Sequence, residues 1–315
     1  MAILVSGSLA YDYIMNFPDT FRNHILPDQL HILSVCFTVD RLERGWGGTG
    51  GNIVYTLKML GDDPIIVSAV GRDGGAYLEY LKKNGIASAL VLEDEKLYTA
   101  SAHITTDKDN NQVTAFYNGP LERAREISIH DLKQKFGLAI VAPTAKEVMM
   151  RHVKECRELG ISAVFDPGQQ ITTFNDAELR TTLSQSAFVI GNDYEIKLLQ
   201  ERTGWDAHEI LKNTPVMITT LGEKGSIVTT ATGEEFDIAP CPPESVDDPT
   251  GAGDAYRAGF FVGVEKGFDY QVCGQMGSVA ASYAVESYGT QHHQFTVKEF
   301  KDRYKKTYGT ELKIK

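Results

Sequence analysis

Short apolar runs alternate with amphipathic stretches along most of the 315-residue chain. The run AILVSGS precedes the amphipathic NIVYTLKMLG, and IIVSAVG precedes AYLEYLKKNG. Further on, GLAIVAP is followed by a helical pattern at 145–159 and then by ISAVFDPG. Parallel strands joined by crossover helices produce this alternation. It predicts an α/β fold with a doubly wound, mostly parallel sheet, with long helices from about Gly251 to Lys266 and near 271–287.

Two segments, 13–44 and 97–120, interrupt this pattern. The second contains YTASAHITT and NQVTAFYNG, which alternate polar and apolar residues and are separated by the turn-rich DKDNN. Such alternation predicts antiparallel strands outside the main sheet. We expect the two segments to assemble into one small β-sheet lid. The α/β core then consists of residues 1–12, 45–96 and 121–315.

Composition narrows the range of partners. The chain has 42 acidic against 31 basic residues, a net charge of −11, which argues against a general affinity for nucleic acid or anionic membranes. Its N-terminal apolar run lacks a basic region before it and predicts a buried strand rather than a signal peptide. No apolar stretch is long enough to cross a bilayer. The cysteines are far apart and predict buried thiols of a reducing, cytoplasmic compartment: Cys36, Cys156, Cys241 and Cys273.

Four polar or glycine-rich spots are candidates for chemistry: Asp12, GGTGGN at 47–52, NDYE at 192–195 and the stretch at 248–254. We expect each to lie near the C-terminal end of a strand, where open α/β sheets bind ligands. In the last stretch, small residues leave bare backbone N–H groups at the start of a helix, which suits an anion. Asp254 follows at once, where it can accept a proton. The chain has no P-loop, no H-E-x-x-H zinc motif and no G-x-S-x-G elbow.

Two motifs make the chain resemble the ribokinase-like, or PfkB, family of sugar and nucleoside kinases. The first is GGTGGN, followed by a helix to Gly61, and the second is DPTGAGDAYRAGF at 248–260. The resemblance extends over nearly the whole chain. It implies a ribokinase-like core with a lid, and phosphoryl transfer from ATP to an alcohol with Mg²⁺ as cofactor.

The resemblance also implies roles for individual residues. Asp254 corresponds to the catalytic base, and the backbone of Gly251, Ala252 and Gly253 corresponds to the anion hole. Glu195 matches the metal-organising acid of an N-x-x-E motif, and Asp248 and Thr250 match positions where some relatives bind a monovalent cation such as K⁺, which is left open. The remaining matches are to ATP-binding positions (Asn192, Thr220, Gly222 and Gly225) and to substrate hydroxyl-binding positions (Asp12, Gly47, Gly48 and Asn52).

The sequence defines the substrate that receives the phosphoryl group less sharply than it defines the reaction. An ionised Asp12 can accept hydrogen bonds from both hydroxyls of a cis-diol, which suits the ribose of a nucleoside but also free ribose or fructose. Within the family, several further details are most similar to bacterial adenosine kinases. They are the lid sequences FPDTFRNHILPDQLHILSV and QVTAFYNG, DPG at 166–168, and Arg257.

Aromatic residues of the lid offer a place for a base. Phe116, Tyr117 and Phe37 either stack on a purine or pack within the lid. We therefore expect conversion of adenosine to AMP at the 5′-hydroxyl, with a ribokinase- or fructokinase-type sugar kinase as the alternative. A non-catalytic descendant is disfavoured because Asp254 and Glu195 are both present. The oligomeric state is left open between monomer and homodimer.

Overall fold

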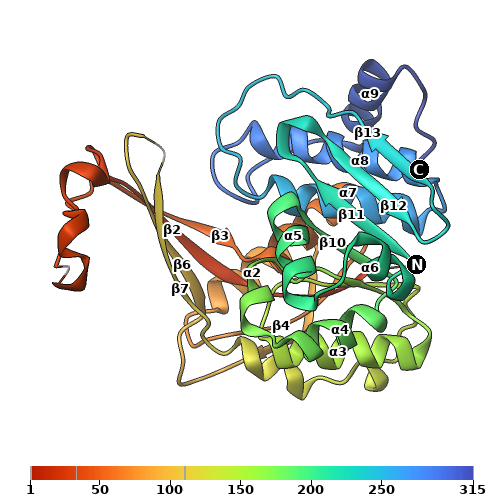
Figure 1. Ribbon diagram of the computed structural model, residues 1–315, viewed down its shortest axis with the longest axis horizontal. Coiled ribbons are helices and arrows are strands. Elements are labelled where there is room, and N and C mark those ends of the chain that lie inside the picture. Colours follow the sequence, from red (N-terminus) through yellow and green to blue (C-terminus); the bar gives the residue numbers. More distant parts are fainter. Residues whose placement is uncertain (1, 33, 110, 315) are drawn as a thin grey trace.

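The structure is a computed structural model that describes residues 2–32, 34–109 and 111–314. Within these residues a nine-stranded sheet forms the core and a four-stranded sheet lies beside it (Figure 1). The strand order of the large sheet is β13-β12-β11-β10-β9-β8-β1-β4-β5. The strands from β11 to β5 in this order pair in parallel, while β12 and β13 pair antiparallel at one edge. The predicted α/β fold with a mostly parallel sheet is confirmed.

The strands of the large sheet are β1 (Leu4–Ser6), β4 (Ile65–Val70), β5 (Ala87–Glu93), β8 (Leu138–Val141), β9 (Ser162–Phe165), β10 (Phe188–Asn192), β11 (Val216–Thr220), β12 (Ser226–Thr230) and β13 (Glu235–Ile238). The helices are α1 (Thr49–Met59), α2 (Gly75–Lys83), α3 (Lys146–Leu159), α4 (Asp176–Ser184), α5 (Asp193–Thr203), α6 (Ala207–Asn213), α7 (Ala252–Glu265), α8 (Tyr270–Val285) and α9 (Val297–Tyr308). The helices expected at 145–159, 251–266 and 271–287 correspond to α3, α7 and α8.

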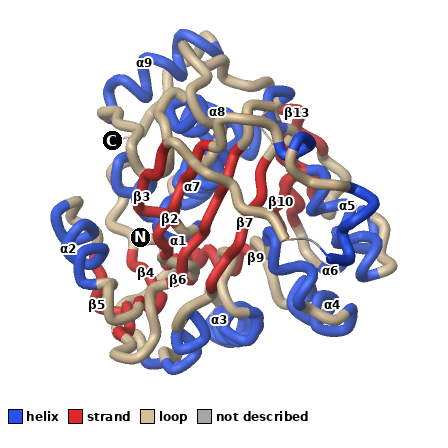
Figure 2. The backbone as a smooth tube through the Cα atoms, turned by 90° about the vertical axis from the view of Figure 1, so that its left-hand side faces the viewer, coloured by secondary structure: helices blue, strands red, loops and turns tan. Residues whose placement is uncertain are grey.

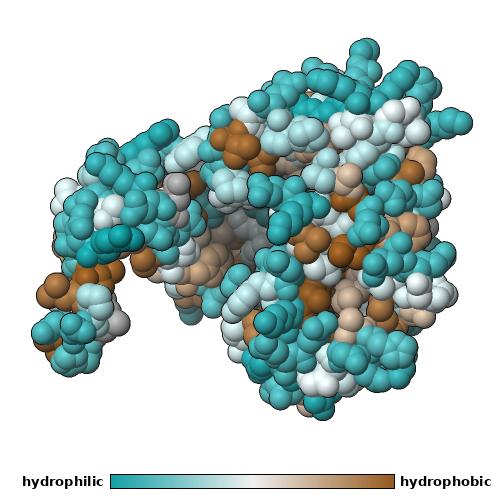
Figure 3. Space-filling model, turned by 45° about the horizontal axis from the view of Figure 1, so that its top comes forward, coloured by the Kyte–Doolittle hydropathy of each residue, from teal (hydrophilic) through white to brown (hydrophobic). Residues whose placement is uncertain are grey.

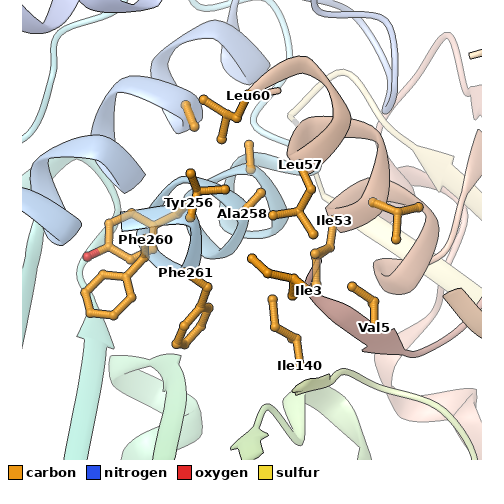
Figure 4. Close-up of a cluster of buried hydrophobic side chains, with 14 of the residues drawn as sticks. Ile3, Val5, Ile53, Leu57, Leu60, Ile140, Tyr256, Ala258, Phe260 and Phe261 are labelled. Atoms are coloured by element: carbon orange, nitrogen blue, oxygen red, sulfur yellow. The ribbon is translucent and has the colours of Figure 1, made fainter. Parts of the chain in front are cut away.

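Helices cover both faces of the large sheet (Figure 2). Successive residues of a strand point to opposite faces. In β1, Val5 joins a buried cluster with α1, α7 and α8, whereas Leu4 joins a second cluster with α3, α4 and α5. Figure 4 shows part of the first cluster, in which Ile53 and Leu57 of α1 lie near Ala258 of α7. This packing fixes the N-terminal ends of α1 and α7 relative to the sheet.

The small sheet contains β2 (Ala10–Asn16), β3 (Arg41–Gly47), β6 (Ala100–Thr106) and β7 (Gln112–Tyr117), in the order β3-β2-β6-β7. The outer pairs are antiparallel, but β2 and β6 pair in parallel. The expectation of purely antiparallel strands is therefore wrong for the central pair. The reason is topological, because the chain passes through α1, β4, α2 and β5 between these strands, and such a long crossover is what parallel pairing requires. The division into core and lid stays a prediction.

Residues 17–32 and 34–40 lie between β2 and β3 and project away from the core (Figure 1; Figure 3). Phe37 packs in this projection against Phe17 and Phe21, with ring centroids 4.9 Å apart in both pairs. Cys36 is exposed, while the other three cysteines are buried, so the expectation of a buried thiol is wrong at this position. The cause is that Cys36 lies in the projection, outside the packed core.

Across residues 2–32, 34–109 and 111–314, no helix combines the length and the apolar character needed to cross a bilayer.

Candidate active site

A cavity of about 590 Å³ lies between the small sheet and the core. Figure 3 shows the surface hollowed between these two parts. Its walls include ten of the predicted site residues: Asp12, Gly48, Asn52, Phe116, Asn192, Glu195, Thr220, Gly251, Gly253 and Asp254. Gly47, Ala252, Gly222 and Gly225 do not line it. The cavity thus brings together residues from both sheets that are up to about 240 positions apart in the sequence.

The N-terminus of α7 forms one wall of the cavity. Gly251 caps this helix with φ 81°, a left-handed conformation that favours glycine. The N–H groups in the first turn of a helix have no carbonyl four residues earlier to bond, so this end attracts anions. The N–H of Ala252 donates to the carbonyl of Pro249 at 3.2 Å, whereas Gly251 and Gly253 line the cavity. Asp254 follows in the same turn.

The Asp254 carboxylate is held by α1. Asn52 donates a hydrogen bond from Nδ2 to Oδ2 of Asp254 at 2.8 Å. Burial raises the pKa of Asp254 to about 7, against the opposing effects of the Arg257 charge and the Asn52 hydrogen bond. A carboxyl group with a pKa near neutrality suits a general base. The pairing also places Asn52, a predicted substrate ligand, directly beside the predicted base.

A buried ion pair supports this turn of α7. Arg257 donates from Nε and Nη2 to the two carboxylate oxygens of Asp166, which follows β9, and from Nη1 to the carbonyl of Gly253 at 3.0 Å. Arg257 is 7% exposed and Asp166 is fully buried. Burial would lower the pKa of Arg257, but the Asp166 charge outweighs it and raises this pKa. The guanidinium group therefore ties the cavity end of α7 to the large sheet and places a positive charge near Asp254.

Asp12 lies inside β2 of the small sheet, not at the end of a core strand as expected. Asp12 is 8% exposed, and burial raises the pKa of its carboxyl group to about 6. The Thr290 hydroxyl lies 2.5 Å from the carbonyl oxygen of Trp46 and 3.3 Å from Oδ2 of Asp12. A Cβ atom on Gly47 would lie 2.1 Å from the same Oδ2. A side chain at position 47 would therefore displace the Asp12 carboxylate from its observed position.

The NDYE motif has a structural role as well as a place in the cavity wall. Asn192 ends β10 and caps α5, where its Oδ1 accepts from the Glu195 N–H and its own N–H donates to Oε2 of Glu195, both at 2.8 Å. This is a capping box. Burial raises the pKa of Glu195, which shows that its charge is poorly compensated by the protein. A hydrated Mg²⁺ held mainly by phosphates fits this donor set, because Mg²⁺ usually takes one or two carboxylates and retains several waters.

The expected ATP-binding turn TLGEKG connects β11 to β12. Thr220 ends β11 and lines the cavity. Gly222 and Gly225 have φ of 60° and 92°, and a Cβ on Gly225 would lie 2.0 Å from the carbonyl oxygen of Ile238. Both glycines therefore shape the turn, and their contribution to ATP binding stays a prediction.

The stretch at 248–254 does not follow a strand as expected, because β13 ends at Ile238 and a loop leads to α7. In this loop Asp248 accepts hydrogen bonds from the N–H of Thr250 at 2.9 Å and of Gly289 at 3.0 Å. In the part of the chain that the structure describes, no group of three His, Cys, Asp or Glu side chains could hold a metal ion. A monovalent cation at Asp248 and Thr250 stays a prediction.

Several cavity residues carry no motif. Gln169 and Gln170 follow DPG, Thr144 follows β8, and Thr290 follows α8. Apart from the glutamines beside DPG, nothing local in the sequence marks them. Their place in the site becomes visible only when these three chain segments meet at the cavity.

Comparison with known proteins decides the family. The model of the pfkB family carbohydrate kinase matches residues 17–296. The chain belongs to this family. A nucleoside kinase of Methanothermobacter thermautotrophicus is 31% identical to this pfkB-family kinase over 295 residues, covering 92% of this chain and 91% of the relative. Ribokinase of Bacillus subtilis is 26% identical over 251 residues, covering 78% and 83%.

Solved structures agree with this assignment. The nucleoside kinase of Burkholderia thailandensis in complex with inosine superposes with a TM-score of 0.91 at 35% identity, covering 98% of this chain and 99% of that chain. The nucleoside kinase of Methanocaldococcus jannaschii gives a TM-score of 0.87 at 28% identity, covering 97% and 99%. This pfkB-family kinase is therefore a phosphotransferase that acts on an alcohol group, of the nucleoside and sugar kinase type.

Proposed function

We propose that this pfkB-family kinase transfers the γ-phosphoryl group of ATP to the 5′-hydroxyl of a nucleoside, with adenosine as the preferred acceptor. The observation that carries the proposal is the placement of Asp12 and Asp254 on one cavity, with Asn52 bound to Asp254. Asp12 can accept from the ribose 2′- and 3′-hydroxyls, while Asp254 receives the proton of the 5′-hydroxyl. The relatives named nucleoside kinases, one of them in complex with inosine, support a nucleoside as the acceptor.

The reaction follows from the groups around Asp254. As the hydroxyl oxygen bonds to the γ-phosphorus in line, the bond from this phosphorus to the β–γ bridging oxygen breaks and ADP leaves. Asp254 accepts the proton of the attacking hydroxyl, a contribution of about 10²–10⁴ in rate. The N-terminus of α7, including the backbone of Gly251 and Gly253, stabilises the charge on the phosphoryl oxygens. Mg²⁺ bound to the phosphates would neutralise part of their charge, with Glu195 and Asn192 beside its water shell.

The apolar part of the cavity favours a nucleoside over a free sugar. Phe116 of β7 is 47% exposed and lines the cavity together with Ile104 of β6 and Leu121. An aromatic ring left open on a cavity wall can stack on a base. Ribose or fructose would leave this apolar wall uncovered. A sugar kinase with the same phosphoryl-transfer residues is the second candidate, and the ribokinase relative supports it.

A substrate panel separates the two candidates. Release of ADP from ATP should be measured with adenosine, inosine, guanosine, cytidine, ribose and fructose. We expect the largest kcat/KM with adenosine. A larger kcat/KM with ribose or fructose would establish the sugar kinase instead.

Replacing Asp12 by Ala should weaken adenosine binding by roughly 1–3 kcal/mol, because the donors of the bound diol lose their acceptor. Isothermal titration in the absence of ATP measures this change. The matched ligand is 2′-deoxyadenosine. It has one hydroxyl fewer that needs an acceptor, so the substitution should cost it less binding free energy. An equal loss for both ligands would show that Asp12 does not bind the diol.

Replacing Glu195 by Gln should raise the Mg²⁺ concentration that gives half-maximal rate, several-fold. The amide oxygen of Gln can still accept the Asn192 N–H in the capping box, so only the charge is removed. Steady-state rates against Mg²⁺ at fixed ATP measure the effect. The capping-box residue Glu178 of α4 offers a matched control, because Glu178→Gln makes the same change away from the cavity. An unchanged Mg²⁺ titration for Glu195→Gln would contradict the assignment.

A further inference from the structure

A chain of buried polar groups leads from the core to Asp254. The Tyr77 hydroxyl donates to the carbonyl of Gly47 at 2.6 Å. Nε2 of Gln291 donates to the Tyr77 oxygen at 2.8 Å and to Oδ1 of Asn52 at 2.9 Å. Asn52 in turn donates from Nδ2 to Asp254. Tyr77 is fully buried, Gln291 is 4% exposed and Asn52 is 8% exposed, so water has little access to this chain.

The direction of every hydrogen bond in this chain follows from its first member. A backbone carbonyl only accepts, so Tyr77 uses its single proton on Gly47 and can only accept from Gln291. The Gln291 amide must therefore present its NH₂ group to Tyr77, and the same NH₂ group meets the oxygen of Asn52. With its oxygen engaged there, Asn52 presents its NH₂ group to Asp254. Turning either amide would place donor against donor or acceptor against acceptor.

Gln291 occupies an unusual backbone conformation. Among the described residues it is the only non-glycine residue with a positive φ, at 59°. A long side chain is strained in this region, and such strain persists only where the surroundings impose it. Its Oε1 atom is buried without a hydrogen-bond partner within the described residues, which is a second cost. Gln291 therefore carries two energetic costs, and it is the residue whose NH₂ group completes the hydrogen-bond chain to Asn52.

We propose that Gln291 is a positioning residue that fixes the orientation of the Asn52 amide, so that an N–H group rather than an oxygen faces Asp254. The proposal rests on the proposed function of Asp254 as the base. An N–H donor stabilises the ionised carboxylate, which is the form that accepts a proton, whereas an amide oxygen would stabilise the protonated form.

Three other charged groups influence Asp254: Arg257 on the same helix, Asp12 from β2 and Asp166 after β9. The experiment must leave these groups in place. Tyr77→Phe removes the group that sets the direction of the chain and keeps the ring. Gln291→Met removes the amide and nearly keeps the side-chain length. The matched control is Tyr80→Phe, because the Tyr80 hydroxyl donates to the backbone carbonyl of Gln291 at 3.1 Å but not to its amide group.

The first readout needs no activity. The Asp254 carboxyl carbon is titrated by ¹³C NMR in the unliganded protein, and its signal is assigned by its absence in Asp254→Asn. We expect Tyr77→Phe and Gln291→Met to raise the Asp254 pKa by about one unit, because the donor to the carboxylate is no longer held. Tyr80→Phe should leave it unchanged. An unchanged pKa in Tyr77→Phe and Gln291→Met, or an equal rise in Tyr80→Phe, overturns the proposal.

The second readout is the pH profile of kcat with adenosine. We expect the acidic limb to move up by about one pH unit in Tyr77→Phe, so that kcat falls about tenfold near pH 6 and returns to the wild-type value above pH 9. KM for adenosine should change less than about threefold. A loss of kcat by the same factor at every pH would indicate a purely structural role and overturns the proposal. Failure of the assignment of Asp254 as the base is distinguishable, because Asp254→Asn would then be as active as wild type.

Discussion

Asp254→Asn should fold, bind adenosine as wild type does, and turn over at least about a hundredfold more slowly. The substitution keeps the shape of the side chain and removes only its ability to accept a proton from the attacking hydroxyl. The loss should therefore appear in kcat, with KM for adenosine nearly unchanged. Rapid-quench measurement of a single turnover separates the chemical step from product release.

Asn52 provides the control for this result. Asn52→Asp has the same shape but replaces the donor to Asp254 by a second carboxylate, so we expect it to impair both binding and turnover. Asp254→Asn should impair turnover alone. A single-turnover rate for Asp254→Asn within tenfold of wild type would remove Asp254 from the role of base.

Arg257→Met should lower the free energy of unfolding by about 3–5 kcal/mol, because it leaves the fully buried Asp166 without its partner. The methionine nearly fills the volume of the arginine stem, so the loss reports the uncompensated charge rather than a cavity. Unfolding in urea, followed by circular dichroism, measures the change.

Two further variants define the origin of this loss. Asp166→Asn combined with Arg257→Met removes the stranded charge and should recover a large part of the stability. Arg303→Met breaks an ion pair with Glu286 in which both side chains are more exposed, at 13% and 16%, so its cost should be smaller. Equal losses for Arg257→Met and Arg303→Met would contradict the account of a buried charge.

The layered core could be predicted from the sequence because its signals are local. Each core strand is a short apolar run and each crossover helix has its own amphipathic pattern, so α3, α7 and α8 were expected within a few residues of where they lie. The parallel pairing of β2 with β6 has no local signal. Ala10 pairs with Ala100, and the order of these strands depends on how the intervening chain crosses the core.

The same difference between local and long-range signals applies to the residues of the site. Asp254, Asn52 and Glu195 could be predicted because they belong to compact motifs, and all three line the cavity. Tyr77 and Gln291 could not, since their importance comes from hydrogen bonds to residues far away in the sequence. The positive φ of Gln291 could not be predicted from its residue type, because this conformation favours glycine or asparagine.

Gly47 illustrates a different limit of sequence reasoning. The resemblance placed it among the residues that bind substrate hydroxyls, yet it does not line the cavity. Its visible roles are to leave room for Asp12 and to accept the Tyr77 hydrogen bond. Position in a motif showed that glycine mattered here, but only the packing shows the physical reason.

Phosphoryl transfer to the 5′-hydroxyl of a nucleoside, with Asp254 as the base, makes a specific prediction about the product. The most direct test is ³¹P NMR of a mixture of ATP, Mg²⁺, adenosine and enzyme, followed over time. The account predicts a new phosphomonoester signal coupled to the two 5′-methylene protons of adenosine, which forms at least about a hundredfold more slowly with Asp254→Asn. A phosphoester on the 2′- or 3′-oxygen, release of inorganic phosphate alone, or equal rates for the two enzymes would contradict it.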